Sequence, residues 1–337
     1  MTIKKLSLSI ALAVTAGLAA SSTSAYVVGI PSSGVLVPMA FHSGPGDTTA
    51  VGLTNHADVG TGDIVVYWSF YNQNSLKQID GEFKMTPNDR YTFVLAEKAP
   101  NFASQRGYLT FAVGNRAGVP IGASISAEAF QANITDGDAE FIPTFPISTL
   151  DWRADTNLFA IGVNDLQLLL SGAHSIDDNL NLDDMTATFD LRYAQDADFD
   201  SEIVIWATGG LRNENGWPVQ IFNDDQQRVS GRMPCPTTEV CRVQVNSENL
   251  PAKPAAFTNG FIRFDLPAGA VRQDWDPDLS ITSAVSYTRV SSQTFGAVQT
   301  ILNTHYADPV DFLGLEPLWT ANFIDNNDAA AVLQGLR

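Results

Sequence analysis

The chain has 337 residues, and its 19 Lys and Arg residues face 37 Asp and Glu residues, so the formal net charge is −18 at pH 7. Binding to nucleic acid or to anionic lipid depends largely on Lys and Arg side chains that neutralise phosphates. The charge therefore argues against both classes of partner. It suits divalent cations, or a protein that stays soluble outside the cell.

The first 25 residues predict export. Lys4 and Lys5 precede an apolar stretch at 6–18, and the small residues SSTSA end at Ala25. These are the parts of a secretory signal peptide, and this apolar stretch and all later ones are shorter than the ~20 residues of a membrane span. We expect cleavage after Ala25, which removes two lysines and leaves a charge of −20. The expected location is periplasmic, secreted or on the cell surface, with no membrane span.

Short apolar runs with period-two alternation follow along the rest of the chain. In the first half they are 34–41, 48–55, 63–71, 90–95, 107–113 and 125–130. In the second half they are 158–163, 185–193, 202–208, 217–222, 260–266 and 281–290. Turn-forming residues separate these runs, and many of their residues are β-branched or aromatic, which indicates antiparallel sheets. We predict an all-β fold of two tandem β-sandwich domains of immunoglobulin-like size.

The predicted domains are 26–149 and 150–312, followed by a C-terminal segment, 313–337. The boundary lies in FIPTFPISTLDWRADTN (141–157), where two prolines interrupt the alternation. A short helix through AAAVLQGLR is expected near the C-terminus. Trp68 and Trp206 are expected to anchor the two cores.

Three pairs of segments suggest that the two halves follow one plan. DIVVYW (63–68) resembles EIVIW (202–206), GYLTFAV (107–113) resembles GFIRFDL (260–266), and SAEAF (126–130) resembles SAVSY (283–287). The order of the segments is the same in both halves. A shared strand composition could also produce these matches, so duplication is a hypothesis.

Two acidic segments are candidate calcium sites. DADFDSE begins like an EF-hand loop, but Ser201 stands where such a loop needs Gly and Ala207 where it needs Glu. A looser calcium site could use the carboxylates of Asp196, Asp198, Asp200 and Glu202. The second candidate, NITDGDAE, offers Asp136, Asp138 and Glu140. The alternative for both segments is an acidic turn that protects a sheet edge.

Cys235 and Cys241 are close in sequence in MPCPTTEVCRVQV. In an exported chain this spacing predicts a disulfide that closes a small loop. No histidine or further cysteine lies nearby to complete a metal site. We expect the bond to hold a local shape, with a contribution of ~2 kcal/mol or less.

The sequence contains no recognisable catalytic motif of the nucleophile-elbow, zinc-protease or phosphate-loop type. We therefore expect a non-catalytic exported protein that acts in adhesion or in surface or matrix assembly, with a protein or glycan partner or with itself. The alternative is a calcium-assisted carbohydrate-binding protein, in which exposed Trp217 and Trp275 stack on sugars. A secreted hydrolase is the third interpretation, because paired carboxylates are easily found in so acidic a chain.

Overall fold

The computed structural model describes residues 31–57, 62–114, 125–133, 138–147, 158, 174–175, 186–207, 210–267, 283–292, 297–302 and 304–307. These residues lie within one compact unit, Tyr26–Asp308. The expected signal peptide, the boundary between residues 149 and 150, and the C-terminal segment with its expected helix lie outside the described residues. The same holds for the run at 158–163, apart from Leu158.

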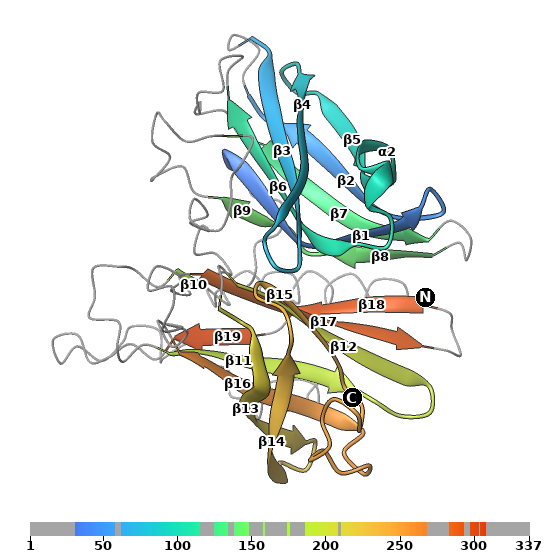
Figure 1. Cartoon of the computed structure of the whole chain (residues 1–337), viewed down its shortest axis with the longest axis vertical. Coiled ribbons are helices and arrows are strands. Elements are labelled where there is room, and N and C mark those ends of the chain that lie inside the picture. Colours follow the sequence, from blue (N-terminus) through green and yellow to red (C-terminus); the bar gives the residue numbers. More distant parts are fainter. Residues whose placement is uncertain are drawn as a thin grey trace, which may run out of the picture. The chain divides into compact units, whose positions relative to one another are not determined.

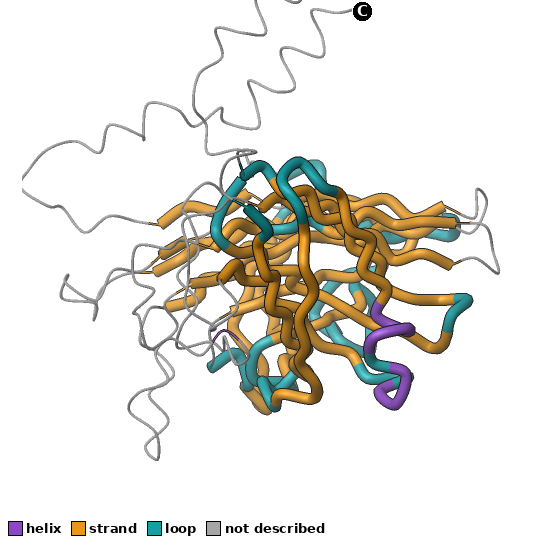
Figure 2. The backbone as a smooth tube through the Cα atoms, turned by 90° about the horizontal axis from the view of Figure 1, so that it is seen from above, coloured by secondary structure: helices purple, strands orange, loops and turns teal. Residues whose placement is uncertain are grey.

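The all-β prediction is confirmed, and the sheets are antiparallel (Figures 1 and 2). Sheet A consists of β5 (Arg90–Val94), β2 (Asp47–Asn55), β7 (Ile125–Asn133) and β8 (Asp138–Ile142). Sheet B consists of β4 (Lys77–Met85), β3 (Ile64–Asn72), β6 (Arg106–Gly114), β1 (Gly34–Gly44) and β9 (Phe145–Ile147). After β5 the chain forms the helical turns α2 (Leu95–Lys98) and η1 (Pro100–Phe102).

Strand β1 connects sheets A and B. Its first residues pair with β6 and β9, whereas its end pairs with β2 at His42 and Gly44. The register with β6 shifts between Val37 and Ala40, which is the kind of irregularity that bends a strand. One strand thus takes part in both sheets.

The strands of the second half form two further sheets. Sheet C consists of β15 (Val240–Gln244), β12 (Phe199–Ala207), β17 (Ser283–Ser292), β18 (Ala297–Leu302) and β10 (His174–Ser175). Sheet D consists of β14 (Arg228–Cys235), β13 (Asn213–Asn223), β16 (Asn259–Pro267), β11 (Thr186–Ala194) and β19 (Thr304–Ala307).

Sheet C is buried on both faces. Because alternate residues of a strand point to opposite faces, Ile203 and Ile205 of β12 pack with sheet D, while Val204 and Trp206 pack with the core of the first nine strands. The ring of Trp206 meets Tyr108 of β6 edge-on, with 5.8 Å between the ring centroids. Sheet C therefore joins the two cores.

The expectation that Trp68 and Trp206 are core residues is confirmed. Trp68 is 5% exposed and packs edge-on against Phe93 of β5 at 5.0 Å, which closes the core between sheets A and B. Trp206 is fully buried. Each ring removes a large apolar area from water, and an edge-to-face pair adds roughly 0.5–1.5 kcal/mol beyond this burial.

The two sets of strands repeat one pairing scheme. In the first repeat, β1–β9, seven pairings occur whose counterparts are present in the second repeat, β11–β19, when ten is added to each strand number. They are β1 with β6, β1 with β9, β2 with β5, β2 with β7, β3 with β4, β3 with β6, and β7 with β8. The counterparts are β11 with β16, β11 with β19, β12 with β15, β12 with β17, β13 with β14, β13 with β16, and β17 with β18. Sheet C is thus the counterpart of sheet A, and sheet D of sheet B.

The correspondence drawn from the sequence was partly wrong. The segment EIVIW belongs to β12, which is the counterpart of β2, whereas DIVVYW belongs to β3, the counterpart of β13. Trp68 and Trp206 consequently do not hold equivalent places. The other two matches, β6 with β16 and β7 with β17, agree with the pairing. The error has a physical cause, since any strand buried on both faces reads as a continuous apolar run. An immunoglobulin-like arrangement of two sandwich domains is not confirmed.

Candidate functional site

A pocket of about 460 Å³ lies where strands of the first repeat meet sheet C. Met39, Phe41 and Ile142 form its apolar wall. Its charged lining residues are Arg106, Arg242, Arg289, Asp47, Asp138 and Glu140. The volume is in the range of small-molecule sites, and a wall of apolar side chains with a few polar groups is typical of them.

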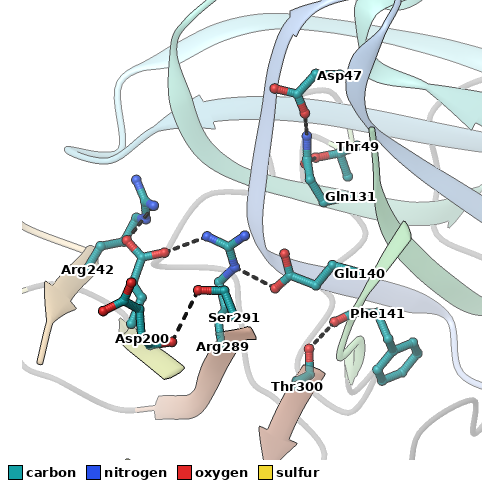
Figure 3. Close-up of polar contacts among 11 residues, drawn as sticks. Asp47, Thr49, Gln131, Glu140, Phe141, Asp200, Arg242, Arg289, Ser291 and Thr300 are labelled. Carbon is teal, nitrogen blue, oxygen red and sulfur yellow. Dashed lines mark hydrogen bonds and ion pairs between the residues drawn. The ribbon is translucent and has the colours of Figure 1, made fainter. Parts of the chain in front are cut away.

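Arg289 joins the two repeats at this pocket (Figure 3). Its Nε donates to Oε1 of Glu140 in β8 at 2.5 Å, and its Nη1 donates to Oε2 of Glu202 in β12 at 2.6 Å. Arg242 of β15 forms an ion pair with the other oxygen of Glu202. Glu202 and Arg289 are direct cross-strand partners in sheet C, so strand pairing places them together.

The buried carboxylates of this cluster differ in their pKa. Burial raises the pKa of Glu140 above its ordinary value, and the hydrogen bond and charge of Arg289 offset only part of this effect. Burial would also raise the pKa of Glu202, but Arg242 and Arg289 outweigh it and hold the pKa below its ordinary value. Burial acts to lower the pKa of Arg289, yet its two carboxylate partners raise it. A second cation is thus what distinguishes the pKa of Glu202 from that of Glu140.

Several hydrogen-bond donors in the pocket have no protein partner among the described residues. The hydroxyl of Tyr287 and Nε of Arg242 are both buried and unpartnered. Arg106 lies over the ring of Phe41, with 4.6 Å from its guanidinium carbon to the ring centroid, and makes no ion pair within the described ranges. Burial and the neighbouring Arg242 lower the pKa of Arg106.

On another side of the pocket, a hydrogen-bond network surrounds Asp47. Gln131 of β7 donates from Nε2 to Oδ1 of Asp47 at 2.6 Å and accepts from the hydroxyl of Thr49 at 2.8 Å (Figure 3). The other Asp47 oxygen accepts from the Ser43 hydroxyl at 3.0 Å. Asp47 is therefore already hydrogen-bonded through both oxygens.

The carboxylates of the first calcium candidate, DADFDSE, are engaged with separate partners in the structure. Oδ1 of Asp196 accepts from the backbone N–H groups of Asp198 and Phe199, each at 2.8 Å, which stabilises the turn before β12. Asp200 accepts from Nε2 of Gln195 at 2.7 Å. Glu202 is buried with its two arginines. The four carboxylates therefore do not converge on one point, and calcium binding here stays a prediction.

The second calcium candidate is divided as well. Asp136 lies outside the described residues. Asp138 accepts from the N–H of Ala139 at 2.8 Å, and Glu140 is paired with Arg289. Nowhere in the described ranges do three His, Cys, Asp or Glu side chains gather as a metal-ligand set. What the structure does bring together is one residue from each candidate, Glu140 and Glu202, and they meet at Arg289.

Trp217, expected to be exposed, is buried. It is 8% exposed, its Nε1 donates to the carbonyl of Leu211 at 2.7 Å, and its ring packs edge-on against Phe264. It therefore offers no free ring face to a sugar. An apolar residue beside an Asn–Gly turn looks exposed in the sequence, but this one begins the paired part of β13. Trp275 lies outside the described residues.

The predicted disulfide between Cys235 and Cys241 is present. Its loop lies against the turn between β3 and β4, where the N–H of Glu239 donates to the carbonyl of Gln73 at 3.1 Å. The N–H of Thr238 donates to Oδ1 of Asn74 at 3.2 Å. Glu239 is 2% exposed, and its burial raises its pKa to about 8, although a hydrogen bond with Tyr108 lowers it. The loop is thus a second point of contact between the repeats.

Sequence reasoning missed the arginines of the pocket, Arg106, Arg242 and Arg289, and it missed Tyr287. The sequence does carry one signal for three of these four. In sheet C, Tyr287 and Arg289 occupy alternate positions of β17, and Arg242 follows two apolar residues of β15. A polar or charged group in a strand buried on both faces needs a partner. Strand pairing within sheet C supplies Glu202 as one partner, and only the stacking of the repeats supplies the other, Glu140.

Among the described residues no helix is long and apolar enough to cross a membrane. Comparison of the chain with models of protein families, with curated proteins and with solved structures finds no match.

Proposed function

We propose that the chain is an exported, non-catalytic β-protein that acts in adhesion or in surface or matrix assembly. It holds a group of its partner in the pocket between the first repeat and sheet C. The observation that carries this proposal is the pocket itself, which is lined from both repeats. Two of its lining residues, Arg242 and Tyr287, each have a buried donor without a protein partner among the described residues.

The carboxylates of the pocket support binding rather than hydrolysis. A glycosidase needs one carboxylic acid and one carboxylate that reach the substrate. Of the lining carboxylates, Glu140 is instead held by Arg289, and Asp47 is held by Gln131 and Ser43. Asp138 accepts from the N–H of Ala139. These ion pairs and hydrogen bonds make the wall rigid, which lowers the entropic cost of binding a partner.

The alternative, calcium-assisted carbohydrate binding, draws no support from the described residues. Trp217 is in the core, and the acidic side chains are engaged in turns or with arginines. The adhesion or assembly role is therefore the one developed further.

A blocked pocket tests the proposal. Ser291→Trp places a large ring on the pocket lining, and Thr92→Trp places the same ring on an exposed position of β5 outside it. Labelled full chain is added to producing cells and to their matrix, and the retained fraction is measured. We expect Ser291→Trp to lose most of the retention and Thr92→Trp to keep it.

Two results would contradict the proposal. One is retention of Ser291→Trp at the level of the unmodified chain. The other is a tagged chain that stays in the cytoplasm of the producing cell.

A further inference from the structure

We infer that the pocket binds a single carboxylate carried on a small body with an apolar face. This inference rests on the proposed binding role of the pocket and names the chemistry of the group that it holds.

The ion pairs of the pocket engage two of its three arginines, although Asp47 and Asp138 also line it. Arg289 is committed to Glu140 and Glu202, and Arg242 shares Glu202. Among the described residues Arg106 has no carboxylate within ion-pair distance, although Asp47 and Glu202 act on it from further away. A ligand with one negative charge would match this arginine.

The unpaired polar atoms point to the same chemistry. The hydroxyl of Tyr287 is buried, has no protein acceptor among the described residues, and lies within the electrostatic range of Arg242 and Arg289. Nε of Arg242 is also a buried donor without an acceptor. A buried donor without a partner destabilises the fold, so a ligand that supplies acceptor oxygens recovers part of this energy. A carboxylate offers two such oxygens and accepts from an arginine in fixed geometry.

Charge limits the ligand to a monoanion. The lining already contains Asp47, Asp138 and Glu140, and the whole chain carries −18. A second negative charge on the ligand would meet these carboxylates without a free cation to balance it. Sulfate and phosphate dianions are therefore disfavoured relative to a carboxylate.

The pocket is larger than the carboxylate group alone. Its volume of about 460 Å³ leaves room for a body of several carbon atoms beside Met39 and Ile142. Burial of apolar area against these side chains would contribute to affinity. The body therefore has at least one apolar face.

Isothermal titration calorimetry of the full chain with four probes tests the inference. The probes are hexanoate, its neutral counterpart hexanamide, glucuronate and inorganic sulfate. We expect hexanoate to bind at least tenfold more tightly than hexanamide, and sulfate to bind more weakly than hexanoate. If glucuronate binds more tightly than hexanoate, the ligand is a carboxylate carried on a sugar. If hexanoate binds more tightly, the ligand is a carboxylate carried on an aliphatic chain.

Three variants locate the site. Arg106→Gln should weaken hexanoate binding at least tenfold, whereas Arg90→Gln, an exposed arginine of the same repeat outside the pocket, should leave it unchanged. Tyr287→Phe should weaken binding about tenfold without lowering the melting temperature, because it removes only an unpartnered hydroxyl. A purely structural role of Tyr287 would instead change stability and leave affinity alone.

Equal binding of hexanoate and hexanamide would overturn the inference, as would sulfate binding that exceeds all carboxylates or an unchanged affinity in Arg106→Gln. The absence of carboxylate binding, combined with a loss of retention in Ser291→Trp, would reject the ligand class and leave the proposed function standing. Full retention of Ser291→Trp, combined with tight hexanoate binding by the unmodified chain, would reject the proposed function and leave the ligand class standing.

Discussion

Tyr71 with Tyr108 in the first repeat and Phe222 with Phe261 in the second occupy the same place in the pairing scheme. Both pairs are direct cross-strand partners with stacked rings, at 4.9 Å and 4.6 Å between centroids. The tyrosines are buried, whereas the more apolar phenylalanines are partly exposed and lie under Arg263. If hydrophobicity alone decided burial, the phenylalanines would be the buried pair. What decides burial here is which sheet face meets the neighbouring repeat.

The opposite difference is found on the faces of sheets A and C that point away from sheets B and D, because here the first repeat is exposed and the second is buried. Thr54 of β2 pairs with Arg90 and Ser126, and all three are at least partly exposed. At the equivalent place in sheet C, Trp206 pairs with Val240 and Val285, and all three are buried. The two repeats therefore share a scaffold and differ in the face they present, in the way terminal units of repeat proteins carry a polar outer face.

The largest test of this comparison is to remove the apolar side chain at the junction. Trp206→Ala should lower the free energy of unfolding by about 3–5 kcal/mol, because it leaves a cavity against Tyr108. Thr54→Ala at the equivalent place should change it by less than about 0.5 kcal/mol. Denaturation by urea measures both. A loss below 1 kcal/mol for Trp206→Ala would mean that the junction is not a core.

A smaller effect is expected from the ionic part of the junction. Arg289→Gln should cost about 3 kcal/mol near pH 7, since it leaves Glu140 and Glu202 buried without this cation. Their pKa should then rise, so the penalty should shrink as the pH falls and both carboxylates are protonated. Arg263→Gln, which removes a more exposed pair with Asp190 in sheet D, should cost about 1 kcal/mol or less. Equal losses for the two variants at pH 7 would contradict the comparison.

Gly107 and Gly260 test the strand packing that the two repeats share, because each lies close to the backbone of the paired strand. A Cβ at Gly107 would lie 1.7 Å from the carbonyl oxygen of Tyr71, and one at Gly260 would lie 1.9 Å from that of Phe222. Each Ala substitution must separate two paired strands, so both should destabilise by about 2–3 kcal/mol and agree within about 1 kcal/mol. Gly52→Ala, where the nearest atom is 3.9 Å away, is the matched control. A large effect in one repeat alone would show that the equivalence fails at this position.

The last prediction concerns the pH dependence that Glu239 confers. Its folded pKa of about 8 lies above its ordinary value of 4.5, so the folded state binds an additional proton between these pH values. The free energy of unfolding should therefore fall as the pH rises from 4.5 to 8. Glu239→Gln should flatten this slope and stabilise the chain at pH 8 relative to the unmodified chain.

Asp89→Asn is the control for Glu239, because Asp89 holds the equivalent place beside β5 and remains partly exposed. It should leave the pH slope unchanged. Thermal melts at half-unit steps of pH measure both variants. A slope that persists in Glu239→Gln would assign the pH dependence to another group.

Most strands could be predicted because each carries an apolar alternation of its own. The strands that were missed, such as β4 and β14, lie at sheet edges. β4 carries charges on both faces, and β14 contains Gly231 and Pro234, so neither reads as a run of apolar alternation. The duplication could be suspected from strand order, but only the pairing gives its register. Trp217 shows the same limit, because its burial depends on strands distant in sequence.

The candidate site was less accessible to sequence reasoning. Glu140 and Glu202 were recognised as residues with possible roles, but calcium was the partner expected for them. The arginines that meet them come from β15 and β17, so no local spacing could reveal the cluster.

The sequence by itself determined that the protein is acidic, built of antiparallel strands and closed by one disulfide, because composition, alternation and cysteine spacing are local properties. The tertiary structure decided which faces of these strands are buried and where three arginines meet. Period-two alternation shows that a strand has two faces, whereas the neighbour that covers each face depends on contacts between residues far apart in the chain.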